Sequence, residues 1–215
     1  MKTIYSYINE KLKLSNQSTL KKYNFYPKNF NDLRSLLKSL LKERGPNADL
    51  NDIDVSKVTT FYDEHINKGL FEDLDPHNID ISKWNVSNVE SMTRMFKYCY
   101  NFTGKKLENW KFPNLKNTNY MFYGCNEFDC NLSNWDVSNI INMSNMFAHC
   151  YNFTGQGLEN WKISKVNNMA YMFSWCKKLH CNLEQWSKYK KFVKTTKMFL
   201  GCDRMQNSLP SWYKY

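Results

Sequence analysis

The sequence predicts an α/β solenoid in which each coil of 25–26 residues holds one short strand and one short helix. Two observations predict this fold class. Tryptophan recurs along the chain in steps of 26, 25, 26, 25 and 26 residues. A Met-Phe pair follows each of the first five tryptophans, and a cysteine follows each pair, so three uncommon residue types keep one phase. The recurring residues are Trp84, Trp110, Trp135, Trp161, Trp186 and Trp212; Phe96, Phe122, Phe147, Phe173 and Phe199; and Cys99, Cys125, Cys150, Cys176 and Cys202.

The spacing within one unit is the reason to expect a strand and a helix. Apolar and polar residues alternate through Trp110-Lys111-Phe112, as in a strand with one buried face. Val137, Ile140 and Met143 follow one another at spacings of three, which suits a turn leading into a short helix. The period itself falls within the range of leucine-rich repeats. No coil of this size can bury its apolar face alone, so the coils must stack and form continuous ladders of Trp, Phe, Met and Cys.

Two stretches carry a family resemblance. WDVSNIINMSNMFAHC at residues 135–150 and WNVSNVESMTRMFKYC at residues 84–99 resemble the BspA-type leucine-rich repeat. The resemblance spans roughly residues 79–212. Proteins with this repeat include bacterial surface proteins and many phage- and virus-encoded chains. The resemblance implies a strand-helix solenoid that binds proteins or builds larger structures, and it implies no catalysis.

The chain divides into three predicted parts. Residues 84–215 are the tandem-repeat solenoid with a basic C-terminal cap, residues 46–83 are a divergent first coil, and residues 1–45 are an N-terminal amphipathic segment and a capping helix. Leucines at helical spacing predict the helix, with Asn29 or Asn31 as its N-cap and Gly45-Pro46 as its stop. A terminal coil has no neighbour on one side, so we expect this helix to cover the open end.

A second amphipathic segment, residues 1–14, precedes the capping helix. Ile4, Tyr5, Ile8 and Leu12 share one face of this segment. Such a face suits a peptide that docks on another protein, and it equally suits an additional capping helix. Two apolar turns offer little burial at a membrane surface, so the expected partner of this face is a protein.

Basic residues gather at the C-terminal end of the chain. The formal net charge is +10, and five lysines lie close together at Lys188, Lys190, Lys191, Lys194 and Lys197. A basic end with interleaved aromatic residues can neutralise phosphates and stack on bases, so nucleic acid is the alternative partner. A solvated solenoid end that keeps the protein soluble explains the same residues.

Motifs for catalysis or cofactor binding are not found in the sequence. There is no Walker-type loop, glycine-rich fingerprint, HExxH motif or nucleophile elbow, so we expect no catalytic residues and no cofactor. Two pairs of cysteines are spaced more widely than zinc ligands usually are, and the repeat already explains the first cysteine of each pair, so no metal site is expected. Seven cysteines cannot pair completely, and their repeat phase favours free thiols.

Features of export and membrane insertion are also not found. No apolar run is long enough to span a bilayer, and the N-terminus lacks the apolar core of a signal peptide. We therefore expect synthesis in the cytoplasm without export. Together with the resemblance, these observations predict a non-catalytic module for protein interaction or structure, a phage virion or assembly component that docks through its N-terminal segment. The alternatives are a nucleic-acid-binding protein that uses its basic end and an adhesin-like protein of the cell surface.

Overall fold

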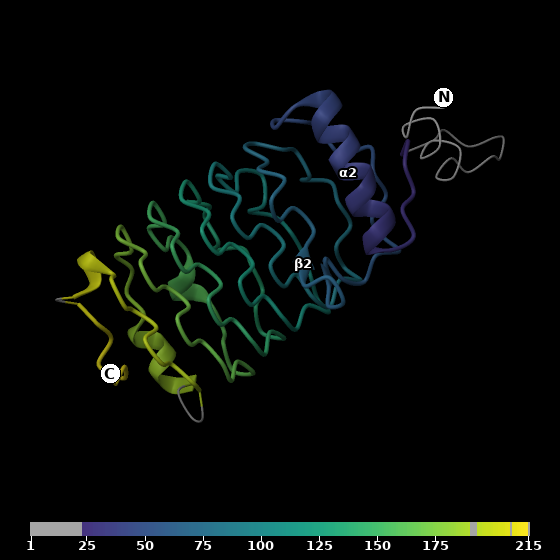
Figure 1. Ribbon diagram of the computed structural model, residues 1–215. Coiled ribbons are helices and arrows are strands. Elements are labelled where there is room, and N and C mark those ends of the chain that lie inside the picture. Colours follow the sequence, from purple (N-terminus) through teal and green to yellow (C-terminus); the bar gives the residue numbers. More distant parts are fainter. Residues whose placement is uncertain (1–22, 190–192, 207, 215) are drawn as a thin grey trace.

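The computed structural model describes residues 23–189, 193–206 and 208–214. Figure 1 shows the chain running from one long helix, α2 (Phe30–Arg44), through a row of stacked coils to the C-terminal end. The other elements are strands β1 (Tyr62–Asp63) and β2 (Lys68–Gly69) and the 3-10 helices η1 (Leu158–Asn160), η2 (Glu184–Tyr189) and η3 (Asp203–Met205). The predicted amphipathic segment, residues 1–14, lies outside the described residues.

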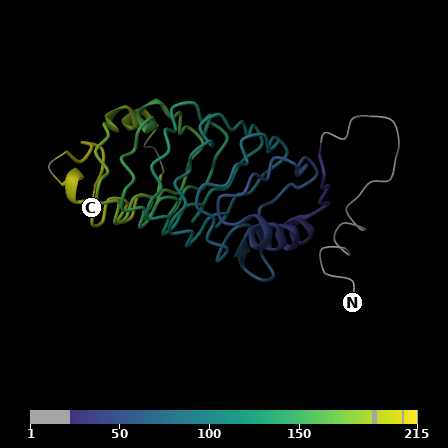
Figure 2. The same ribbon diagram turned by 90° about the horizontal axis from the view of Figure 1, so that it is seen from above.

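Helix α2 begins and ends at the capping residues. The Asn29 side chain accepts a hydrogen bond from the Asp32 N–H at 2.9 Å, which satisfies one of the free N–H groups of the first turn. Gly45 follows the helix at φ 81°, an angle that favours glycine, and its N–H donates to the Leu41 carbonyl. The leucine-rich face of the helix is buried, and Figure 2 shows the helix beside the first coils. Helix α2 therefore lies against the N-terminal end of the stack.

Neighbouring coils are joined by a repeated set of backbone hydrogen bonds. The N–H groups of Met92, Arg94, Phe96 and Tyr98 donate to the carbonyls of residues 117, 119, 121 and 123 in the next coil, at 2.8–3.0 Å. The same pattern recurs in each later coil, and a single parallel bridge marks each contact. The bridging residues are Thr60, Ser91, Asn117, Asn142, Asn168 and Lys194.

The structure differs from the expectation of one short strand and one short helix per coil. From residue 84 onward, the described coils consist of turns, with 3-10 segments at η1, η2 and η3. The Met95 N–H donates to the Met92 carbonyl, and the Cys99 N–H donates to the Phe96 carbonyl, so each link closes a four-residue turn. Linked four-residue turns place apolar residues three or four positions apart, as a helix does. Hydrophobic periodicity could not separate the two conformations.

Aromatic side chains fill the interior in register. The Phe122 ring centroid lies 5.6 Å from that of Phe96 and 5.7 Å from that of Phe147, with the rings nearly parallel. The indole of Trp135 donates its Nε1–H to the Leu107 carbonyl of the preceding coil at 2.9 Å, and the other ladder tryptophans make the equivalent bond. The core is therefore a continuous column in which each coil is stabilised by its neighbours.

The first coil is longer than the later ones. Thr60 bridges Ser91, 31 residues further on, whereas the following bridges are 25 or 26 residues apart. The additional residues form the β1–β2 hairpin. After the hairpin, Phe71 stacks on Phe96 at 5.1 Å and so begins the phenylalanine ladder. The expected divergent coil at residues 46–83 thus contains an inserted hairpin and a ladder residue that the sequence did not identify.

Candidate functional site

A row of aromatic side chains lies on the outside of four consecutive coils. We call Tyr98, Tyr123, His149 and Trp175 the aromatic row. Their ring centroids follow one another at 5.4, 5.2 and 6.2 Å. Tyr98 and Trp175 are exposed, and Trp175 has 41% of its surface open to solvent. Because the phenylalanine ladder already fills the core, packing of the coils does not require these rings at the surface.

Neighbouring side chains broaden the aromatic row and hold it in place. Further tyrosines lie within 6.1 Å of a row member, namely Tyr100, Tyr120 and Tyr151. The Lys97 ammonium lies 4.8 Å from the Tyr98 ring centroid and within 5.8 Å of two more rings. A cation above aromatic faces is attracted to them, so it restricts the rings to one arrangement. The result is a tyrosine-rich surface with restricted rotamers.

The backbone beneath the row adopts an unfavourable conformation. Tyr98, His149 and Trp175 have φ angles of 63°, 62° and 65°, in the left-handed region. For a bulky L-residue this region costs roughly 1–2 kcal/mol. The equivalent residues of the other two coils are Gly124 and Gly201, at φ 74° and 70°. The backbone at this repeat position therefore favours glycine, and the three aromatic residues occupy it against that preference.

Partial burial shifts the ionisation of the row. Burial lowers the pKa of His149 below its ordinary value, which favours the neutral imidazole at pH 7. Burial and the surrounding tyrosines raise the pKa of Tyr123, so that its hydroxyl stays protonated. The row is therefore uncharged at neutral pH. Positive charge beside it comes from Lys97 and from Lys177, which lies over the Tyr151 ring.

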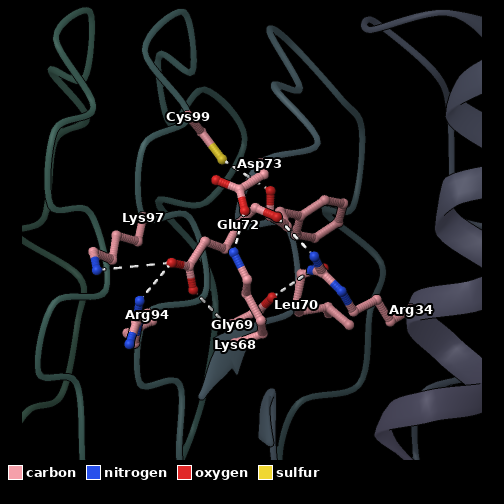
Figure 3. Close-up of polar contacts among 10 residues, drawn as sticks. Arg34, Lys68, Gly69, Leu70, Glu72, Asp73, Arg94, Lys97 and Cys99 are labelled. Atoms are coloured by element: carbon pink, nitrogen blue, oxygen red, sulfur yellow. Dashed lines mark hydrogen bonds and ion pairs between the residues drawn. The ribbon is translucent and has the colours of Figure 1, made fainter. Parts of the chain in front are cut away.

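A buried polar cluster joins helix α2 to the first coil (Figure 3). Arg34 extends from α2 and donates to the main-chain carbonyls of Gly69, Leu70 and Glu72 at 2.5, 2.6 and 2.8 Å. The buried Glu72 carboxylate accepts from the Gly69 N–H at 2.9 Å and from Arg94 at 2.7 Å. Arg34 thus satisfies carbonyls that a preceding coil would otherwise have to satisfy. This cluster stabilises the end of the stack rather than presenting reactive groups.

The residues predicted from the sequence lie in different parts of the molecule. The tryptophan, phenylalanine and cysteine ladders, from Trp84 to Cys202, are buried in the core. Lys188, Lys194 and Lys197 are exposed near the C-terminal end. The remaining predicted residues lie outside the described part of the chain, namely Ile4, Tyr5, Ile8, Leu12, Lys190 and Lys191.

The thiols are free and poorly ionised. All seven cysteines are free, and six of them are buried. Burial raises the pKa of Cys130, Cys181 and Cys202 to about 12, which disfavours the reactive thiolate at neutral pH. Among the described residues, no group of three or more His, Cys, Asp or Glu side chains could hold a metal ion. In the same part of the chain, no helix has the length and apolar character needed to cross a membrane.

The sequence contained a signal for the aromatic row that the reasoning from periodicity missed. The residue before each ladder cysteine reads Tyr98, Gly124, His149, Trp175 and Gly201 along the five coils. Alternation between aromatic residues and glycine at one repeat position indicates a left-handed backbone, which glycine adopts without strain. That pattern separates these rings from the buried ladders.

Comparison with known proteins identifies the family. The chain belongs to the family described as "Mycoplasma protein of unknown function, DUF285", which matches residues 11–106 and again residues 101–212. These two matches include helix α2 as well as the coils. No curated protein and no solved structure matches the chain. The surface of the coils is therefore the basis for the functional proposal.

Proposed function

We propose that this protein is a non-catalytic interaction module, a leucine-rich-repeat-like solenoid that binds a protein partner across the aromatic row. The strained, solvent-facing rings of Tyr98, His149 and Trp175 are the observation that carries the proposal. Glycine at these positions would relieve the backbone, and the core does not use the rings. Strain of this kind is concentrated at binding and catalytic sites, which supports a role in recognition.

The chemistry of the row favours a protein partner. Tyrosine and tryptophan dominate protein interfaces because they bury a large area with little loss of rotamer freedom. Contacts between rings and with Lys97 already restrict Tyr98, so less entropy is lost when a partner binds. The hydroxyl groups of Tyr100 and Tyr151 add hydrogen-bonding capacity at the edge of the apolar area.

Nucleic acid is the second candidate partner. Bases can stack on aromatic rings, and lysines beside the row can contact phosphates. The exposed Lys188, Lys194 and Lys197 add positive charge near the C-terminal end. We favour protein because uncharged tyrosine rings, rather than cations, make up most of the row.

The finer classification extends this proposal. Membership of the BspA-like group, and a place in a larger assembly such as a virion, are supported by the resemblance of residues 84–99 and 135–150 to that repeat. An adhesin-like role is the alternative use of the same surface. Docking through residues 1–14 is tested separately, because deletion of this segment should abolish assembly while the coils stay folded.

A matched pair of surface variants tests the proposal. Trp175→Gly removes a ring from the row, and Ile141→Ser removes an equally exposed apolar side chain elsewhere, each being 41% exposed in the parent. Partners are cross-linked in the producing cells, purified with each variant and quantified by mass spectrometry. We expect Trp175→Gly to lose the partner of the parent protein at least tenfold and Ile141→Ser to retain it. Because relief of roughly 1–2 kcal/mol of strain offsets lost ring contacts, Trp175→Gly should remain folded.

Two outcomes would count against the proposal. Retention of the partner by Trp175→Gly, or equal loss in both variants, means that the row does not bind it. Substitution of the five C-terminal lysines by glutamine addresses the other candidate. Binding that weakens steeply with salt, and that disappears only in this lysine variant, would favour nucleic acid.

A further inference from the structure

A polar groove lies between helix α2, the β1–β2 hairpin and the bridging face of the first coils. Its volume is about 650 Å³, within the range of roughly 300–1,000 Å³ that is typical of small-molecule sites. Asn31 lies at the α2 side, Asp63 and His65 at the hairpin side, and Asn117 and Asn119 on the coils. Three separate parts of the chain therefore converge on one cavity, and none of them belongs to the aromatic row.

The hairpin wall of this groove is not needed to build the stack. It is the insertion that makes the first coil longer than the following ones. Its tip residue Ile66 is 55% exposed, so the hairpin extends beyond the core instead of covering it. A wall that projects from the coil beside a cavity is better explained by contact with a ligand than by packing.

The floor of the groove presents amide donors in fixed orientations. The Asn117 Oδ1 accepts from the Asn119 N–H at 3.2 Å, and the Asn119 Oδ1 accepts from the Thr93 hydroxyl at 2.7 Å. The Ser91 hydroxyl donates in turn to Thr93 at 3.0 Å. Both amide oxygens are thus occupied, and neither Nδ2 group has a partner among the described residues. Preorientation of donors lowers the cost of binding a ligand.

The hairpin wall supplies acceptors and negative charge. One oxygen of Asp63 accepts from the His65 N–H at 2.9 Å, and the other has no partner in the described part of the chain. Glu64 is exposed beside it, and no lysine or arginine is among the residues that line the groove. Phosphates and carboxylates are therefore repelled. A hydroxyl group both donates and accepts, so vicinal hydroxyls match this combination of amide donors and carboxylate acceptors.

The backbone of the floor argues against an extended peptide as the ligand. A peptide that adds as a strand needs free main-chain donors and acceptors at an edge. Here the Met92 N–H already donates to the Asn117 carbonyl, and the Thr118 N–H donates to Asn142 in the next coil. From the side-chain chemistry and the occupied backbone, we infer that the groove binds a short uncharged saccharide.

A conservative substitution with a matched control tests this inference. Asn117→Asp replaces the free Nδ2 donor by an oxygen but keeps the acceptor for the Asn119 N–H. Asn142→Asp makes the same change one coil further on, where the Oδ1 accepts from the Ser144 N–H at 3.0 Å, outside the groove lining. The full chain is screened on immobilised neutral di- and trisaccharides, and the affinity is measured by titration calorimetry. We expect at least a tenfold loss for Asn117→Asp and no change for Asn142→Asp, with similar melting temperatures.

Each of the other outcomes overturns the inference. These are no binding to any saccharide of the panel, equal affinity in Asn117→Asp and the parent, and equal loss in both variants. Tighter binding of a sugar phosphate than of the neutral sugar contradicts the charge argument. Trp175→Gly should bind saccharide as the parent does, because Trp175 does not line the groove. Failure of this inference is therefore distinguishable from failure of the proposed protein interaction.

Discussion

Replacement of Arg34 by methionine isolates the contribution of the cap between α2 and the first coil. The Arg34 side chain is 8% exposed and donates to three carbonyls. Methionine keeps an apolar side chain of similar length but has no donor. The Gly69 carbonyl then keeps the Glu72 N–H at 3.3 Å, whereas the carbonyls of Leu70 and Glu72 have no other donor among the described residues.

The expected loss of stability follows from these two carbonyls. A buried acceptor left without a donor costs about 1–3 kcal/mol, so two of them together cost about 2–6 kcal/mol. Burial also lowers the pKa of Arg34, which means that the buried charge is itself unfavourable and that methionine removes this penalty. We therefore expect Arg34→Met to lower the free energy of unfolding by about 2–4 kcal/mol.

Urea unfolding, followed by circular dichroism and tryptophan fluorescence, measures this loss. Arg44→Met is the control on the same helix, since its 2.9 Å ion pair with Asp52 is partly exposed. Ion pairs of that kind contribute about 0–1 kcal/mol. If Arg34→Met destabilises the protein no more than Arg44→Met does, the carbonyls of the first coil find other donors and the reasoning is refuted.

Three further predictions address the core, the carboxylates and the thiols. Phe147→Ala removes a fully buried ladder ring and should lower the free energy of unfolding by about 3–5 kcal/mol in the same urea assay; a loss no larger than that of Ile141→Ser would contradict the stacked core. Burial opposes ionisation of Asp80, but hydrogen bonds from Lys106, Asn51 and Ser82 outweigh it and hold the pKa of Asp80 far below its ordinary 3.8. Because its folded pKa is depressed, Asp80 stabilises the fold above pH 3.8 and this contribution is lost as the pH falls, so acid unfolding should shift less in Asp80→Asn, and an unchanged pH dependence relative to the parent would refute it. At pH 8 iodoacetamide should label Cys181, which is partly exposed, before the six buried cysteines, and all seven should react in urea; disulfides in freshly isolated protein would show that the thiols are not free.

Some elements of the fold could be predicted because their causes are local in sequence. Asn29 and Gly45 bound helix α2, since capping depends on a side chain and a backbone angle at the helix ends. The phase of Trp135 and Phe147 indicated interior positions, because residues at one repeat position occupy the same place in successive coils. Phe71 was missed because the inserted hairpin shifts it out of phase.

By itself the sequence determined the period, the ladder residues and the capping helix, because each depends on apolar spacing or end-capping chemistry within a short stretch. Only the tertiary structure decided that the coils are made of turns, since their N–H groups bond to the next coil and a helix has the same apolar period. The tertiary structure also decided which rings face outward on a left-handed backbone, as at Trp175. It likewise brought Asn117 beside α2 and the hairpin. Surfaces of this kind depend on contacts between segments far apart in the chain, which local spacing does not encode.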